Sequence, residues 1–352
     1  MLTISGVVQL QRRYLRCPAG CGGTFPLDER LGVKGYVSWS AQRLLSLAAG
    51  SWSYDQAAEH LHEFCGLRVS DTTIRAIAQQ HGGQMRRWQH QEPAAGAAFR
   101  QAEGEAEFAT DGTSVNTTHG WREMRVGVFA KRKRGKPQSV ARWEERHLPA
   151  PAARVAFAGL VRADSFGGQW RQWASRLGLK QTQELTVLAD GARWIWKQMD
   201  RHLPGAQGVL DIYHASAHLH QTAAVLHGER TPAAQRWVDA RRRRLLQGGA
   251  SSLLNVFAEE RKTLRSPRDR ASLDGLCDYL RPHWEHTPYR QRLVNGQTIG
   301  SGMVEGACKT VIGRRLKQTG ARWRIRRVER MATLCCMLYG RQWDAYWSSQ
   351  AA

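Results

Sequence analysis

The chain has 352 residues, 42% of them hydrophobic, so it is long enough and apolar enough to bury the cores of two or three modules. Lysine and arginine number 52 against 30 acidic residues, and the formal charge of +22 indicates a polyanionic partner, with nucleic acid as the leading candidate. No apolar run reaches the roughly 18 residues of a membrane-spanning helix, and seven cysteines, an odd number, favour a reducing compartment. Composition therefore excludes a disordered tail and a membrane protein, and we expect a cytoplasmic protein associated with the nucleoid.

The first segment, residues 1–35, begins with an alternating pattern from Thr3 to Arg16 that predicts a strand. A turn between Cys17 and Cys21 follows, and two thiolates at this spacing supply half of a tetrahedral zinc site, which needs four ligands. No second cysteine pair lies nearby in the sequence. We therefore interpret this segment as partially zinc-ribbon-like, and the sequence leaves zinc binding open.

Residues 36–92 predict three short helices, the second capped by Ser53 and the third by Ser70. Their short connections, with Gly66 between the last two, suit a helix-turn-helix domain, whose last helix, expected at 70–82, enters a DNA groove. The side chains that this helix would offer to bases are Thr72, Thr73, Arg75, Gln79 and Gln80. A helical bundle without DNA contacts is the alternative that the same pattern allows.

An alanine- and glycine-rich linker is expected at residues 93–104, followed by a catalytic core whose first part is 105–222. Within that part, strands are expected at 105–110, 121–130, 139–148, 184–189 and 206–210, and helices at 152–177, 192–202 and from 211 onward. Such alternation is typical of an α/β sheet. Residues 223–297 predict a charged helical insertion, and residues 298–352 predict the final helices of the core.

Three acids stand out in this pattern: Asp111 and Asp190 each follow a predicted strand, and Glu305 lies early in a predicted helix. Taken singly, an Asp-Gly turn or a helix first turn explains each of them. Together they can converge on a pair of divalent cations, which prefer oxygen ligands and promote in-line phosphoryl displacement. Asp211 also follows a short strand, but it heads a helix, where an N-cap role is the simpler explanation.

Positive charge follows Glu305 directly in the sequence. The cations concerned are Lys309, Arg314, Arg315 and Lys317. Such side chains contact phosphates, which position DNA without reading its sequence. This region therefore combines one acid with a cluster of cations.

Several short motifs are spread over nearly the whole chain. They are the segment Cys17 to Leu31, Asp111-Gly-Thr, Trp121 to Phe129, Ala189 to Trp196, Asp211-Ile-Tyr-His-Ala, Gly300 to Lys309, and Arg315 to Gly320. In these motifs the chain resembles ISKra4-type insertion-sequence transposases, which belong to the DDE group. The resemblance implies an α/β fold with a ribonuclease H-like mixed sheet and an all-helical insertion, preceded by a small helix-turn-helix domain and a partial cysteine knuckle.

Position by position, the resemblance implies that Asp111, Asp190 and Glu305 hold two Mg²⁺ or Mn²⁺ ions, with Asp211 and His214 as an auxiliary Asp-x-x-His signature. It implies an enzyme that acts as a homo-oligomer on double-stranded DNA, binds terminal inverted repeats, cleaves the DNA and joins the 3′-hydroxyl to target DNA. Two rivals stay open. A non-catalytic DNA-binding protein, either a regulator or an inactive transposase copy, would keep the basic surface, and a junction-resolving nuclease would share the fold and the metals.

Overall fold

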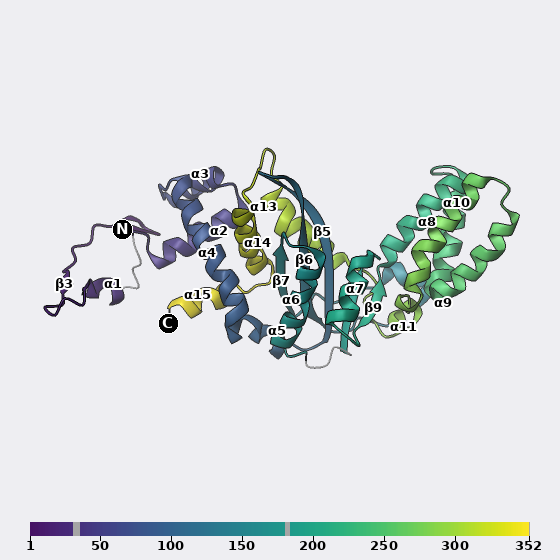
Figure 1. Ribbon diagram of the computed structural model, residues 1–352, viewed down its shortest axis with the longest axis horizontal. Coiled ribbons are helices and arrows are strands. Elements are labelled where there is room, and N and C mark those ends of the chain that lie inside the picture. Colours follow the sequence, from purple (N-terminus) through teal and green to yellow (C-terminus); the bar gives the residue numbers. More distant parts are fainter. Residues whose placement is uncertain (31–35, 180–183, 352) are drawn as a thin grey trace.

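The computed structural model describes residues 1–30, 36–179 and 184–351. The architecture is mixed α/β, and Figure 1 shows an N-terminal arm, a helical domain, a central sheet and a helical insertion placed one after another along the long axis. The C-terminal helices return to the helical domain, so both chain ends lie on the same side of the sheet (Figure 1). Over the described ranges, no helix is both long and apolar enough to cross a membrane.

The central sheet has five strands in the order β7-β6-β5-β8-β9. They are β5 (Glu105–Thr117), β6 (Gly120–Arg132), β7 (Ala153–Gly159), β8 (Leu185–Ala189) and β9 (Gln207–Leu210). β6 runs antiparallel to β5 and β7, whereas β8 runs parallel to both β5 and β9. All five residues of β8 are buried, as expected for a strand inside a parallel pairing. The sheet is therefore mixed.

The third strand lies later in the chain than the sequence predicts. Residues 139–148, expected as a strand, contain the helical turn η2 (Val140–Glu145) instead. Strand β7 follows where the start of a helix was expected, and Val155 and Phe157 are buried in it. The prediction fails here because a short apolar run fits the period of a strand as well as that of a helix.

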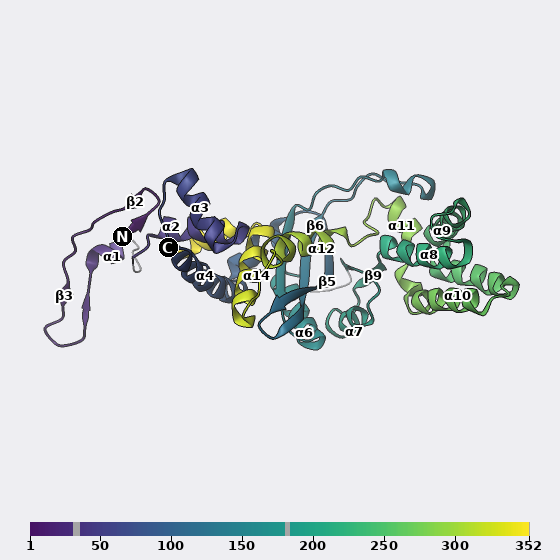
Figure 2. The same ribbon diagram turned by 90° about the horizontal axis from the view of Figure 1, so that it is seen from above.

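One face of the sheet is aromatic. Phe108 of β5 packs against Phe129 of β6, with ring centroids 4.4 Å apart, and against Trp170 of helix α6 (Ala163–Arg176), 4.9 Å away. Helices α6 and α7 (Arg193–His202) lie along this side of the sheet (Figure 2). The large rings fill the space between the strands and α6, so this face is a packed core.

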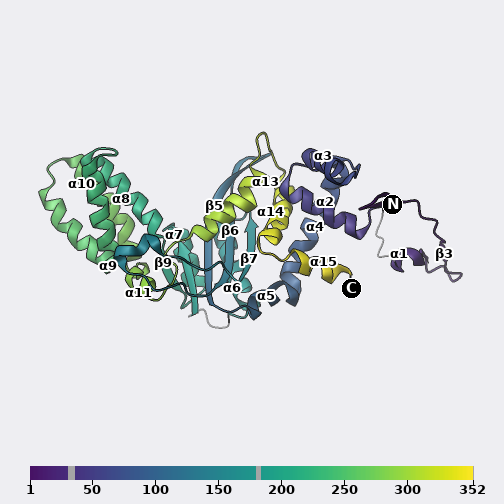
Figure 3. The same cartoon turned by 180° about the vertical axis from the view of Figure 1, so that it is seen from behind.

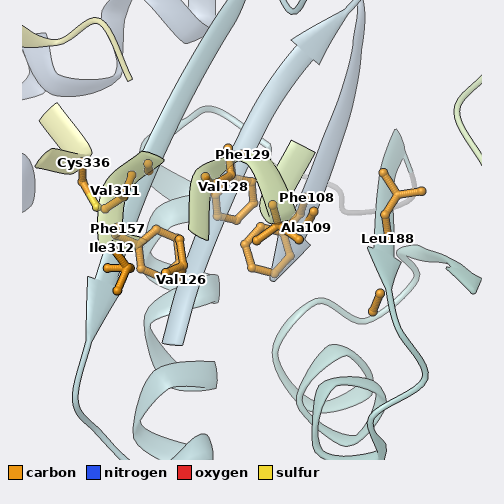
Figure 4. Packing of buried hydrophobic residues seen from close by; sticks show 14 of the residues in the cluster. Phe108, Ala109, Val126, Val128, Phe129, Phe157, Leu188, Val311, Ile312 and Cys336 are labelled. Atoms are coloured by element: carbon orange, nitrogen blue, oxygen red, sulfur yellow. The ribbon is translucent and has the colours of Figure 1, made fainter. Parts of the chain in front are cut away.

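The opposite face of β5 carries Asp111 and Thr113, because successive side chains of a strand point to alternate faces. The helical segments on this side are α12 (Gly302–Ala307), the π-helix η5 (Cys308–Gly313), α13 (Arg314–Leu316) and α14 (Ile325–Tyr339). Val311 and Ile312 of η5 belong to the buried apolar cluster shown in Figure 4. This packing holds the Glu305 helix over the strand that carries Asp111.

Three helices form the helical domain, as the sequence predicts. They are α2 (Trp39–Ser51), α3 (Tyr54–Cys65) and α4 (Asp71–Gln91). Ser53 and Ser70 cap α3 and α4, each accepting an N–H bond from the residue three positions further on. Gly66 ends α3 in the left-handed region, with φ of 63°. α4 continues to Gln91, past its predicted end at residue 82.

Helix α14 lies between the helical domain and the sheet, packing on α4 on one side and on β7 on the other (Figure 3). The carboxylate of Glu329 on α14 lies 3.6 Å from Nη1 of Arg86 on α4 and accepts the N–H of Leu160, next to β7, at 3.4 Å. A Cβ added to Gly82 of α4 would lie 2.4 Å from the carbonyl oxygen of Arg330. The two modules therefore share one helix and one continuous core.

Residues 93–104, predicted as a linker, carry two short helical segments. They are η1 (Pro93–Gly96) and α5 (Ala97–Gln101). Ala95 and Phe99 are buried. The small residues here permit close packing, so this segment is part of the core and not an open connection.

The N-terminal arm departs from the single strand predicted between Thr3 and Arg16. It forms two short hairpins and one helix, β1 (Leu2–Thr3) with β2 (Gly6–Val7), β3 (Leu15–Arg16) with β4 (Gly23–Thr24), and α1 (Pro26–Arg30). Gly6 has a φ of 105°, which reverses the chain and interrupts the predicted strand. Cys17 and Cys21 lie in the turn of the second hairpin and are joined as a disulfide.

The segment predicted as a helical insertion contains helices throughout. They are α8 (Ile212–His227), α9 (Pro232–Thr263), α10 (Pro267–Leu280), η4 (Arg281–His286) and α11 (Tyr289–Val294). Within a run of four arginines on α9, Arg241 pairs with Glu260 and Arg242 with Asp239. Half of that run is therefore engaged inside the insertion. The last helix of the chain is α15 (Trp343–Ala351).

Candidate active site

Asp111 and Asp190 come from the neighbouring strands β5 and β8, at the level where β8 ends. β5 and β8 are parallel, with Ala109 opposite Leu188, so continuing this register by two residues sets Asp111 against Asp190. β5 runs on to Thr117, and Asp111 therefore lies inside the strand and not at its end as predicted. The parallel strand β8 ends at Ala189, just before Asp190. Ligands gather outside the carboxyl ends of parallel strands.

The Asp111 carboxylate is half-buried and accepts a hydrogen bond from the N–H of Gly112 at 2.6 Å. Burial raises the pKa of Asp111, and the nearby charges of Asp190 and Glu305 raise it further, while the Gly112 N–H and His214 act in the opposite direction. Charged neighbours shift a pKa strongly only at short range. Asp190, Glu305 and His214 thus all act electrostatically on Asp111.

The turn that carries Asp190 is held by the helical insertion. The Tyr279 hydroxyl donates to the carbonyl oxygen of Asp190 at 3.0 Å, and Nε2 of His283 donates to that of Gly191 at 3.1 Å. Burial raises the pKa of Tyr279 and lowers the pKa of His283 to about 4, so at neutral pH the phenol is protonated and the imidazole is uncharged. Gly191 has a φ of 96°, a conformation that favours glycine. α10 and η4 thereby position the backbone at Asp190.

Asp211 is fully buried and is the N-cap of α8, as the sequence predicts. Its Oδ1 accepts the N–H groups of Tyr213 at 2.6 Å and of His214 at 3.1 Å. Its Oδ2 accepts the hydroxyl of Ser301 at 2.6 Å and the backbone N–H of the same residue. Both oxygens are therefore engaged by two donors each. This arrangement ties the start of α8 to the start of α12.

Glu305 follows Ser301 by one helical turn on α12, and its Oε1 lies 3.6 Å from Nε2 of His214. Both side chains are partly exposed. Beyond Glu305 the helix widens into the π-helix η5, a departure from α-helical geometry that is frequent at functional sites. Both residues of the Asp211-x-x-His214 signature therefore contact the region around α12: Asp211 binds Ser301, and His214 contacts Glu305.

The donor set suits hard divalent cations. Carboxylate oxygens are preferred ligands of Mg²⁺, and a cation among Asp111, Asp190 and Glu305 would offset the repulsion that raises the pKa of Asp111. Across the described part of the chain, no group of three or more His, Cys, Asp or Glu side chains lies close enough together to hold a metal ion. By the chemistry of their side chains, the three carboxylates suit Mg²⁺ or Mn²⁺. The disulfide leaves Cys17 and Cys21 without a thiolate, so zinc binding there stays a prediction for the reduced chain alone.

The predicted DNA contacts differ in their accessibility. Exposed side chains are Thr72, Gln80, Lys309, Arg314 and Lys317, and half-buried ones are Thr73 and Arg75. Gln79 is only 7% exposed, and its amide donates to the Tyr54 hydroxyl at 3.2 Å and to the Arg327 carbonyl at 3.1 Å. Arg315 is 3% exposed and donates to the carbonyl of Ala49. The prediction of Gln79 as a base contact is wrong because that face of α4 packs on α14, and Arg315 is not a surface contact.

The sequence analysis did not single out three residues that shape the site. Ser301 lies between two glycines in a quoted motif, directly before the Glu305 helix, and a serine at that place is a recognisable capping signal. Tyr279 and His283 contact the Asp190 turn from 89 and 92 residues away. No local pattern indicates such long-range pairs.

Comparison with known proteins places these residues in a family. The sequence profile of the Uncharacterised protein family (UPF0236) matches residues 164–347, a span that includes Asp190, Asp211, His214 and Glu305. No match was found among curated proteins. Because the matched span is more than half of the chain, the protein belongs to the uncharacterised protein family UPF0236.

Proposed function

We propose that the protein is a DNA transposase of the DDE group, similar to ISKra4-type enzymes, which binds terminal inverted repeats, cleaves DNA in a Mg²⁺-dependent reaction and joins the 3′-hydroxyl to target DNA. The observation that carries this proposal is the convergence of Asp111, Asp190 and Glu305 at one sheet edge. The strand order supports a ribonuclease H-like core, since β5, β6 and β7 form an antiparallel meander and β8 and β9 extend it in parallel.

In this proposal Asp111, Asp190 and Glu305 hold the metal ions, which when bound activate the attacking oxygen and stabilise the leaving oxygen of an in-line phosphoryl displacement. The protein's own part is to hold these carboxylates in place. β5 and β8 fix the two aspartates, and Tyr279 fixes the Asp190 turn. His214 lies against Glu305 and is placed to restrain its side chain.

DNA binding by the helical domain is the second part of the proposal. α4 exposes Thr72, Ala76 and Gln80, a stripe at helical spacing that begins in its first turn, while Ile74 and Ala78 are buried. The first turns of a recognition helix are those that reach base edges. This exposed stripe supports α4 as the reading helix of a helix-turn-helix domain. The exposed cations after Glu305 would then contact phosphates.

The proposal is tested with a labelled duplex that carries the inverted repeats flanking the gene. We expect cleavage at the repeat end with Mg²⁺ or Mn²⁺ and none with EDTA. Binding without cleavage under any divalent cation would favour the rival, a non-catalytic DNA-binding protein. Preferential cleavage of a four-way junction over the linear duplex would instead indicate a junction-resolving nuclease.

We also expect DNA affinity to fall steeply with salt. Each phosphate that a protein neutralises adds roughly 0.9 to the slope of log affinity against log salt. With Lys309, Arg314 and Lys317 exposed, the slope should be about 2.7 or steeper. Fluorescence anisotropy over a series of salt concentrations measures it, and a nearly flat plot would show that the charge serves another purpose.

A further inference from the structure

A groove of about 1170 Å³ lies between the helical domain and the segment that follows Glu305. The first turns of α3 and α4 form one wall, and residues 313–324 form the other. Arg327 of α14 and Thr118, in the turn between β5 and β6, complete its lining. The groove is therefore built jointly by the helical domain and the core.

Cations dominate the lining of the groove. They are Arg75, Arg314, Arg315, Lys317, Arg322, Arg324 and Arg327, against two acids, Asp55 and Asp71. Within the part of the chain that the structure describes, none of these seven cations lies within 4.0 Å of a carboxylate, whereas Arg132 pairs with Glu107 and Arg261 with Asp274. The groove thus concentrates positive charge that the protein does not itself neutralise.

Arg315 lies beneath this charge and is nearly inaccessible. Its guanidinium lies between the rings of Tyr54 and Trp323, 4.9 and 5.0 Å from their centroids, and its Nε donates to the carbonyl of Ala49 at 2.6 Å. These partners are uncharged, and Nη2 has no hydrogen-bond partner among the described residues. A buried guanidinium without a counter-ion is unfavourable, so an anion held in the groove would stabilise it.

One lining residue of the groove contacts the strand that carries Asp111. Lys317, which lines the groove, donates through Nζ to the Thr113 hydroxyl. Thr113 follows Asp111 by two residues in β5, so both side chains lie on the same face, about 7 Å apart along the strand. Lys317 therefore joins the basic groove to the face of β5 that carries Asp111.

We propose that this groove binds the phosphate backbone of double-stranded DNA and leads the strand to be cleaved toward Asp111; the inference rests on the proposed function and deepens it. The six accessible or partly accessible cations, which are the seven without Arg315, exceed what a single phosphate engages, and they suit a polyanion. Contacts of this kind position DNA without reading its sequence. Recognition of the base sequence then falls to the exposed stripe of α4, and the first turn of α4 adjoins the groove.

The test compares two triple variants of the full chain. R314Q/R324Q/R327Q removes three exposed groove cations, and R236Q/R265Q/R268Q removes three exposed cations of the insertion, so the loss of charge is equal. With a random-sequence duplex of about 30 base pairs, we expect the groove variant to bind at least roughly tenfold more weakly at about 0.1 M salt, with a slope lower by about one per arginine. The insertion variant should lose much less DNA affinity than the groove variant. Circular dichroism confirms that both remain folded.

Equal losses of DNA affinity in the two triple variants overturn the proposal that the groove binds DNA. The proposed function still stands in that case, provided the wild type binds and cleaves DNA. A wild type that binds no DNA overturns both. A single strand or duplex RNA of the same length that binds as tightly as duplex DNA also overturns the assignment. As an independent measurement, a photo-crosslinking residue at exposed Thr319 in the groove should link to DNA, and one at exposed Ala271 on α10 should not.

Discussion

Replacing Asp111 by asparagine, or Glu305 by glutamine, is expected to lower Mg²⁺-dependent cleavage by on the order of 10³-fold or more and to leave DNA affinity nearly unchanged. Under the proposed function both carboxylates hold the metal ions, so each substitution removes a metal ligand. Binding, in contrast, is spread over many cations. Gel assays of cleavage and anisotropy measurements of binding, on the same inverted-repeat duplex, give the two quantities separately.

Stability provides the control for this prediction. The pKa of Asp111 is raised by burial first, then by Asp190 and Glu305, so its ionised form is disfavoured in the folded state. A raised carboxyl pKa contributes stability below the unfolded value, near 3.9, and loses that contribution as pH rises through the folded value. Asp111→Asn should therefore unfold at a temperature no lower than the wild type at pH 7, and this advantage should vanish in acid. An Asp111→Asn enzyme that cleaves at the wild-type rate would remove Asp111 from the site.

Replacing Asp211 by alanine is expected to destabilise the fold by on the order of 3–5 kcal/mol. The change deletes a buried N-cap and leaves the N–H groups of Tyr213, His214 and Ser301 without their acceptor. Asp211→Asn keeps one capping oxygen but turns an amide toward Ser301, so its loss should be smaller and most of its cleavage activity should remain. Urea denaturation, read by tryptophan fluorescence, measures the difference.

Asp190→Asn makes the same chemical change at the other candidate aspartate and is the control for Asp211→Asn. It should fold with nearly wild-type stability, because among the described residues its side chain accepts one N–H bond, from Ala192 at 3.0 Å. It should lose Mg²⁺-dependent cleavage, because Asp190 is the second metal ligand in the proposed function. The reverse pattern, a stable but inactive Asp211→Asn beside an active Asp190→Asn, would move the second metal ligand to Asp211. The triad would then be Asp111, Asp211 and Glu305.

Strong local signals account for the parts of the fold that the sequence predicts well. Ser53 and Ser70 mark helix starts because their hydroxyls satisfy free N–H groups, and β8 is recognisable as an apolar run that ends in an Asp-Gly turn. Strand β7 was missed because its apolar residues fit two periods equally well. The extension of β5 past Asp111 depends on pairing with β6, which local propensity does not encode.

In the candidate site, too, some features have a local sequence signal and others depend on tertiary packing. The three carboxylates are predicted from their places after strands and in a helix, and the charges of Asp190 and Glu305 act on Asp111 in the structure. The burial of Gln79 depends on α14, and the burial of Arg315 depends on Ala49, Tyr54 and Trp323. These partners lie far away in the sequence or in another element, so neither burial could be read from the sequence. A charged or polar residue on a helical pattern gives no sign of which neighbour will cover it. Tertiary packing decides that.

Helix α14 also has a consequence for where the DNA would be cut. Glu329 contacts Arg86 of α4 and the chain next to β7, so α4 and the sheet that carries Asp111 pack on the same helix. Under the proposed function, the span from the bases read by α4 to the bond cut at Asp111 is then set by the protein and not by a flexible tether. Since B-DNA turns once in about 10 base pairs, such a span corresponds to a fixed count of base pairs and a fixed side of the double helix. The chain would act as a ruler, measuring its cut from the sequence that it recognises.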